Sequence, residues 1–217
     1  MTPTTFRRPA VLAPGREDEA ARHLRRYVDV STAGTPSGFT GAFFDGWDPD
    51  GRRAEDADRF TADDLVAVTF LSVEIPPRAA QQLLVEQRGA LSRLLAEVVE
   101  RDLVDVEEPL TPSSPEWQLN DALRTIDGIG PTTASKLMAR KRPRLLPIYD
   151  SVIDQHVLSG SGVLWEPLRQ ALRADGRALH EQLVALRVRA GVGDSISAIR
   201  VVDILAWMEG KGYIPAS

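Results

Sequence analysis

Apolar residues recur every three or four positions along most of the chain, the spacing of a helix with one buried face. In residues 17–28 this spacing puts Ala20, Leu24 and Val28 on one side. No segment shows the apolar–polar alternation, rich in β-branched residues, that indicates a strand. The sequence therefore predicts an all-α, multi-helix globular fold with about nine or ten helices. The remaining helical segments are expected at residues 61–75, 78–84, 89–103, 113–125, 151–159, 163–174, 177–189 and 195–209, with one more beginning at residue 131.

Three of these helices have recognisable starts. Thr61 begins the segment TADD, which resembles a capping box with carboxylates in the first turn. Ser113 and Glu116 match a second capping box around a proline at the first helical position. Asp194 is the expected N-cap of the last helix.

Glycine and proline interrupt the helical pattern in residues 31–53, which indicates a loop. The same residues include Phe39, Phe43, Phe44 and Trp47, too many aromatic side chains for a disordered linker. We expect an ordered loop whose aromatic side chains fill the core. The alternative is that they form the lip of a ligand or base pocket.

A polar connection at residues 105–114 is the best candidate for a domain boundary. It predicts an N-terminal helical half, residues 1–108, which carries the aromatic loop, and a C-terminal helical half, residues 109–217. A single compact domain is the alternative, since 217 residues can form one core.

Composition excludes several classes of protein. Hydrophobic residues make up 43% and charged residues 26% of the chain, as in an ordinary soluble globular protein. No apolar run is long enough for a membrane span, and the N-terminus lacks the apolar region of a secretory signal. Cysteine is absent and the three histidines are scattered, so we expect no bound metal and no cofactor. The prediction is a cytoplasmic protein of undetermined oligomeric state.

Charge is unevenly distributed around the net value of −5. Residues 121–150 hold six Lys or Arg and three Asp, a local charge of +3. Residues 41–70 hold three Arg and eight Asp or Glu, a local charge of −5. A basic face on an acidic protein can still attract phosphate locally, although a solvated surface is the alternative interpretation.

Residues 126–150, IDGIGPTTASKLMARKRPRLLPIYD, contain a glycine turn, a basic cluster and a single acid at the end. Gly128 and Gly130 permit a tight turn and the close approach of another backbone, with Ile129 between them pointing inward. Pro131 then sets the first turn of a helix, whose free N–H groups suit a phosphate.

The stretch GIGPTTASKL resembles the helix-hairpin-helix motif, and the wider segment resembles the helix-hairpin-helix DNA glycosylase superfamily. The resemblance covers about 30 residues of the chain. It implies duplex DNA as the partner and a catalytic role for Asp150, which lies 20 residues after Gly130. The chain also resembles a bacterial family of unassigned function. The residues expected to contact the DNA backbone are Gly128, Ile129, Gly130, Thr132, Thr133, Lys136, Arg140, Lys141, Arg142 and Arg144.

Two departures from the superfamily narrow the activity that the resemblance implies. Members that also cut the strand have a lysine two residues after the second hairpin glycine, where this chain has Thr132, so no Schiff base is expected. The cysteine-ligated iron–sulfur module of some members cannot form without cysteine. The implied enzyme is a monofunctional, cofactor-free DNA N-glycosylase that acts on a modified base.

A single carboxylate suits that chemistry, because positive charge develops on the sugar as the bond to the base breaks. The base must first be flipped into a pocket, for which Trp117 and Tyr149 are the candidate aromatic walls.

Two other interpretations of residues 126–150 stay open. Asp150 can serve as an N-cap alone, in a non-catalytic DNA-binding or structure-sensing module built on the same scaffold. The turn can also be purely structural, in a helical protein with an unrelated partner. The acidic residues between Asp45 and Asp64 favour this last interpretation if they share a face with the turn, because they would repel DNA.

Overall fold

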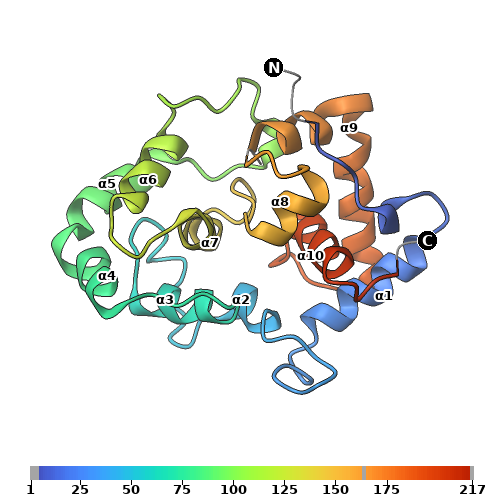
Figure 1. Ribbon diagram of the computed structural model, residues 1–217, viewed down its shortest axis with the longest axis horizontal. Coiled ribbons are helices and arrows are strands. Elements are labelled where there is room, and N and C mark those ends of the chain that lie inside the picture. Colours follow the sequence, from blue (N-terminus) through green and yellow to red (C-terminus); the bar gives the residue numbers. More distant parts are fainter. Residues whose placement is uncertain (1–4, 163–164, 216–217) are drawn as a thin grey trace.

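A computed structural model describes residues 5–162 and 165–215, and this part of the chain consists of helices and connections without a strand (Figure 1). The prediction of an all-α fold is confirmed. Short 3-10 helices lie at Ala10–Leu12 and Leu103–Asp105, and α4 continues into a π-helical turn at Gln82–Glu86. The α-helices are α1 (Glu17–Val28), α2 (Ala42–Gly46), α3 (Ala62–Thr69), α4 (Pro77–Gln81), α5 (Arg88–Glu97), α6 (Pro115–Arg124), α7 (Pro131–Lys141), α8 (Ser151–Val157), α9 (Trp165–Ala190) and α10 (Ala198–Gly210).

The predicted capping is confirmed at one of the three helix starts. Thr61 caps α3 through a complete capping box. Helix α6 begins at Pro115, as predicted, but its N-cap residue is Ser114, so Ser113 lies one residue too early to cap the helix and its capping box with Glu116 does not form. Asp194 does not cap α10, because the chain stays irregular as far as Ser197, whose Oγ accepts a hydrogen bond from the amide of Arg200.

The predicted break between the helices at residues 163–174 and 177–189 is present. Helix α9 runs across both segments, but its backbone is not helical from Ala174 to Arg177. Asp175, Gly176 and Arg177 have φ angles of 49°, 66° and 72°, so the chain turns sharply there. Residues 163 and 164 lie outside the described part of the chain.

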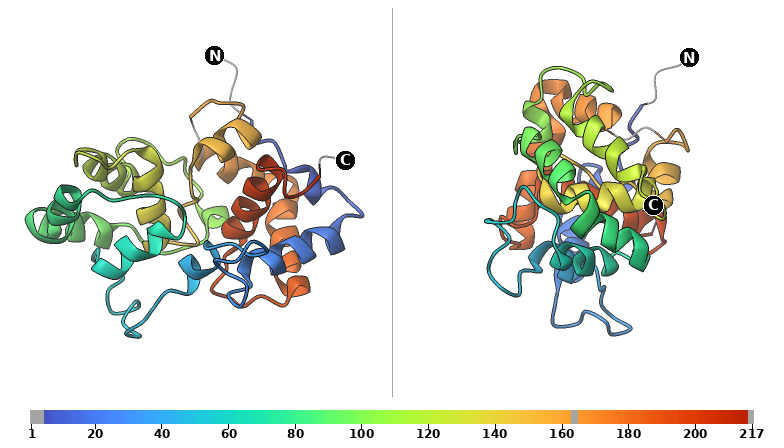
Figure 2. Two further views of the ribbon diagram at one scale, coloured as in Figure 1. Left: turned by 60° about the horizontal axis from the view of Figure 1, so that its bottom comes forward. Right: turned by 90° about the vertical axis from the view of Figure 1, so that its left-hand side faces the viewer.

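The two predicted halves are not packed separately. Helix α1, near the start of the chain, packs against α9 and α10 near its end. Figure 2 shows these three helices together on one side of the molecule, with α3 to α6 on the other. The buried hydrophobic side chains form one cluster that extends from Phe6 to Ile214. This packing favours the alternative of one compact domain over a boundary at residue 108.

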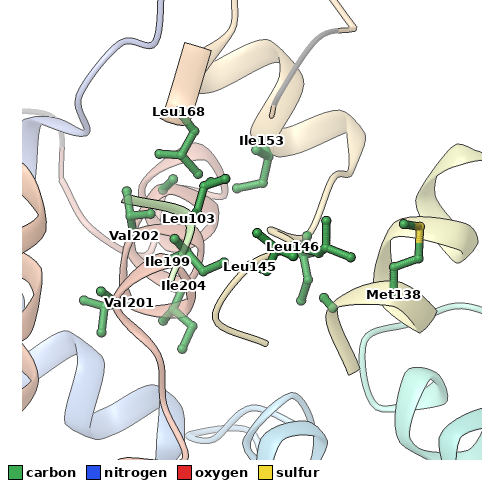
Figure 3. Packing of buried hydrophobic residues seen from close by; sticks show 14 of the residues in the cluster. Leu103, Met138, Leu145, Leu146, Ile153, Leu168, Ile199, Val201, Val202 and Ile204 are labelled. Atoms are coloured by element: carbon green, nitrogen blue, oxygen red, sulfur yellow. The ribbon is translucent and has the colours of Figure 1, made fainter. Parts of the chain in front are cut away.

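The segment between α7 and α8 connects the two sides. Figure 3 shows Leu145 and Leu146 of this segment between Met138 on α7 and Ile199 on α10. Both leucines are almost completely buried. The segment is therefore fixed by the core on both sides as it leads to Asp150.

The aromatic loop is ordered, as expected, and contains the short helix α2. Phe44 is 2% exposed and belongs to the core. The rings of Phe43 and Trp47 pack against Phe70, with centroids 5.3 and 5.1 Å away. Phe39 lines a pocket, so the loop supports both interpretations of its aromatic side chains. Among the described residues, no helix combines the length and the apolar character that a membrane crossing requires.

Candidate functional site

The turn between α6 and α7 depends on one of its two glycines. Gly128 has a φ of +87°, and a Cβ atom there would lie 2.7 Å from Cγ of Pro76. Gly130 has an ordinary φ of −82° and open space where a Cβ would project. Ile129 is 4% exposed and points inward, as predicted. Gly128 therefore meets a steric requirement of the turn, whereas Gly130 leaves a surface open.

Helix α7 begins at this open surface and holds the segment that leads to Asp150. Gly130 is its N-cap residue and supplies no capping side chain. Thr132 is half-buried, whereas Thr133 and Ser135 are buried. The amide of Tyr149 donates a hydrogen bond of 3.0 Å to Oγ of Ser135. The start of α7 thus fixes the residue directly before Asp150.

Asp150 caps α8 and also lines a cavity. Its Oδ1 accepts a hydrogen bond of 2.9 Å from the amide of Ile153, so the capping role predicted for it is confirmed. The side chain is half-buried and faces a pocket of about 310 Å³, which also includes Thr132 and Lys136. Asp150 and the first turns of α7 therefore form one wall of the same pocket.

Lys136 lies inside this pocket and is only 5% exposed. Its Nζ donates a hydrogen bond of 2.8 Å to the carbonyl oxygen of Leu71, just beyond the end of α3. Burial lowers the pKa of Lys136, and the nearby carboxylate of Asp150 opposes that shift. The predicted contact of Lys136 with the DNA backbone is not available in this arrangement, because the ammonium group points into the protein.

An aromatic wall completes the pocket. Tyr27 from α1, Phe39 from the loop and Trp207 from α10 all line it. The rings of Tyr27 and Phe39 are stacked at 5.2 Å, and Trp207 meets Phe39 edge-on at 5.9 Å. Spacing along the chain does not reveal this wall, because its three rings come from distant segments.

A buried ionic network, which the sequence analysis missed, lies beside these rings. Arg200 donates from Nε to Asp45 at 3.0 Å and from Nη2 to the hydroxyl of Tyr27 at 3.2 Å, and it also pairs with Asp203. Burial raises the pKa of Asp203 to about 7, against the attraction of Arg200 and with help from the charge of Asp150. A signal for this network was present: Arg200 and Asp203 are the only charged residues in the first ten positions of an otherwise apolar helix.

The basic cluster after Lys136 points inward, against the acidic segment. Arg140 is 2% exposed. Its Nη1 donates a hydrogen bond of 2.9 Å to the carbonyl oxygen of Phe44, and its Nε lies 3.4 Å from Oδ1 of Asp64. Nζ of Lys141 pairs with the same carboxylate at 2.5 Å and donates to the carbonyl oxygen of Asp56 at 3.0 Å. The predicted DNA contacts of Arg140 and Lys141 are therefore wrong for this structure, because both cations bind the protein's own residues between Phe44 and Asp64.

Arg142 and Arg144 differ in the same respect. Arg142 is 4% exposed and donates to the carbonyl oxygens of Val98 and Leu95 at 2.5 and 2.6 Å, so its predicted DNA contact is wrong as well. Arg144 lies on the surface, where its Nε donates a hydrogen bond of 2.9 Å to the carboxylate of Asp102. Of the five cations expected to contact phosphate, Arg144 alone is exposed.

The two aromatic residues predicted to form the base pocket line a different cavity. Trp117 and Tyr149 belong to a second pocket of about 300 Å³, which shares no lining residue with the first. Trp165 also lines it, and its ring centroid lies 4.6 Å from that of Trp117. The prediction that they form a pocket holds, but the pocket is not the one beside Asp150.

Comparison with known proteins supplies a family but no activity. The profile of a family of unknown function (DUF6308) matches residues 20–210. No curated protein and no solved structure matches the chain. Within the described residues, no group of three or more His, Asp or Glu side chains is placed to hold a metal ion.

Proposed function

The chain belongs to this family of unknown function, and we propose that it binds duplex DNA at the α6–α7 turn and hydrolyses the N-glycosidic bond of a modified base beside Asp150. One observation supports the proposal above others. The carboxylate of Asp150 faces a cavity whose wall includes the start of the helix that follows the turn. A DNA strand held at the turn would thus lie next to the acid.

The pocket has the chemical groups that this reaction needs. Rings of Tyr27, Phe39 and Trp207 offer apolar faces on which an extruded base can stack. As the bond between C1′ and the base nitrogen breaks, the carboxylate of Asp150 stabilises the positive charge on the sugar. Water forms the new bond to C1′ and gives a proton to Asp150, while the departing base takes a proton from solvent. The reaction consumes one water and needs no cofactor.

A structural turn without DNA binding is the second candidate, and one observation favours it. Lys136, Arg140, Lys141 and Arg142 are all buried, so they cannot attract phosphate from the surface. Their inward orientation also explains the local charges of the sequence, because Arg140 and Lys141 pair with Asp64 and Arg142 pairs with Asp58.

A substitution at Gly130 separates DNA binding from folding. Gly130 is the N-cap residue of α7 with open space beside it, and Asp and Ser are both good N-cap residues. Gly130→Asp and Gly130→Ser should therefore both fold, but only the aspartate adds a negative charge where phosphate would lie. At low salt, we expect the duplex affinity of Gly130→Asp to fall by at least about tenfold relative to Gly130→Ser. Equal affinities would support the structural turn.

Base release tests the enzyme. Purified protein is incubated with duplexes that each carry one modified base, and free base and abasic sites are measured. We expect release from at least one duplex, and its loss in Asp150→Asn with duplex affinity retained. Asparagine can still accept the hydrogen bond from Ile153, so α8 should keep its cap. Absence of release across a broad panel would exclude the glycosylase and leave the non-catalytic module.

A further inference from the structure

The second pocket has features of a binding site independent of Asp150. It opens between α6, the start of α7 and the first residue of α9 and has a volume of about 300 Å³. Three aromatic side chains line it: Trp117, Tyr149 and Trp165. The indole of Trp117 is held by a hydrogen bond of 3.1 Å from Nε1 to the carbonyl oxygen of Leu110. Burial and the nearby carboxylate of Asp154 raise the pKa of Tyr149. The ring of Trp117 is therefore fixed at its edge, and the three rings offer stacking surface for a planar group.

Two polar side chains in this pocket have unused hydrogen-bonding capacity. Asn120 is only 7% exposed, and its amide nitrogen donates a hydrogen bond of 3.2 Å to the carboxylate of the neighbouring Asp121. No described residue donates a hydrogen bond to its carbonyl oxygen, and this oxygen is not one of the buried side-chain atoms without a partner, so solvent reaches it. Asn120 thus presents an acceptor to a ligand in the pocket.

Arg124 supplies a charge at the rim. Its side chain is exposed and lines the pocket, and it forms no hydrogen bond or ion pair with any described residue. A free guanidinium beside an aromatic pocket suits an anionic group, above all a phosphate.

We propose that this pocket binds a nucleotide, with the base among Trp117, Tyr149 and Trp165, an N–H group of the base (the exocyclic amino group in adenine) donating to Asn120, and the phosphate at Arg124. The site does not depend on the proposed glycosylase, because it shares no lining residue with the Asp150 pocket. The nucleotide is either free in solution or part of a single strand, and the chemistry recognised is the same.

Calorimetry with adenosine 5′-monophosphate, adenosine and inorganic phosphate tests the two parts of the ligand. We expect the monophosphate to bind in the micromolar to low millimolar range and adenosine to bind roughly tenfold more weakly. Arg124→Ala should weaken binding of the monophosphate by a similar factor and leave adenosine unchanged. Arg88→Ala is the matched control, because Arg88 is also exposed but does not line the pocket.

Further variants and a second probe complete the design. Asn120→Leu should weaken both adenosine and its monophosphate, and Asp150→Asn should weaken neither, which separates this site from the proposed active site. A short single-stranded oligonucleotide that binds more tightly than the monophosphate, with the same dependence on Arg124, would identify the source as a strand. Weaker binding of the oligonucleotide would identify a free nucleotide.

Two results would overturn the inference. The first is the absence of saturable binding of the purine and pyrimidine monophosphates up to about 5 mM. The second is binding that Arg124→Ala and Asn120→Leu both leave unchanged in proteins that melt at the wild-type temperature.

Discussion

Replacing Arg142 by methionine should destabilise the protein strongly, although a lysine- and arginine-rich cluster normally lies on a surface. The guanidinium is enclosed and donates to four carbonyl oxygens, those of Leu95, Val98, Ala57 and Lys141. It also pairs with a carboxylate oxygen of Asp58 at 2.5 Å. Methionine keeps most of the apolar stem but removes every donor.

The magnitude follows from the groups left behind. The carbonyls of Leu95 and Val98 lose a charged donor in a buried location, and each unsatisfied group costs about 1–3 kcal/mol. The side chain of Asp58 is 60% exposed, so loss of that ion pair adds little. Part of the cost is offset because methionine is easier to bury than arginine. We expect the free energy of unfolding to fall by about 3–5 kcal/mol, and the melting temperature by roughly 10 °C.

Urea denaturation followed by circular dichroism measures this change, and Arg144→Met is the control. Arg144 lies two residues away in the sequence, but its side chain is 57% exposed and pairs with Asp102 on the surface. Its loss should cost at most about 1 kcal/mol. If Arg142→Met leaves stability unchanged but lowers affinity for duplex DNA, the cluster faces a ligand and the inward orientation is wrong.

Two further predictions concern the turn and the buried ionic network. Gly128→Ala should lower the free energy of unfolding by about 1–3 kcal/mol, because alanine disfavours a φ of +87° and its Cβ would meet Pro76. Gly130→Ala should change the free energy of unfolding by less than about 1 kcal/mol. Equal urea midpoints for the two variants would refute this difference. For Asp203, the fold raises the pKa from 3.8 to about 7, so the folded protein binds the proton more tightly than the unfolded chain. The free energy of unfolding should therefore decrease as pH rises from about 4 to 7, and Asp203→Asn should flatten that part of the profile. Urea titrations across this pH range that give the same profile for both proteins would contradict the prediction.

Local patterns predicted most of the helices, but not α2, which lies in the segment expected to be a loop. The capping box at Thr61 and the break near Gly176 depend on residues close in sequence, and both are present. The capping box expected at Ser113 does not form, because α6 begins at Pro115 and its N-cap residue is Ser114. Asp150 was predictable as a capping residue because its hydrogen bond goes to Ile153, three residues away.

The site depends on contacts between distant segments, which local patterns do not contain. The aromatic wall joins Tyr27 to Trp207, and the ionic network joins Asp45 to Arg200. Local charge counts predicted the positive charge of residues 140–142 but not whether their side chains point outward or inward. Only the packing of α7 beside the acidic segment determines that these cations point inward.

The burial of this cluster changes what a DNA complex of this protein would require. Without Arg140, Lys141 and Arg142, the exposed cations that line the two pockets are Arg124 in the second and Lys211 in the first, while Arg144 pairs with Asp102. Each phosphate contact made through a cation steepens the salt dependence of binding, so affinity carried mainly by backbone N–H groups would depend weakly on salt. Tight binding would then have to come from bases inserted into the two pockets, one lined by Asp150 and the other by Tyr149, where the aromatic rings are. A protein built in this way would prefer distorted or single-stranded DNA to an intact duplex, because an unpaired base reaches a pocket at a lower cost in free energy.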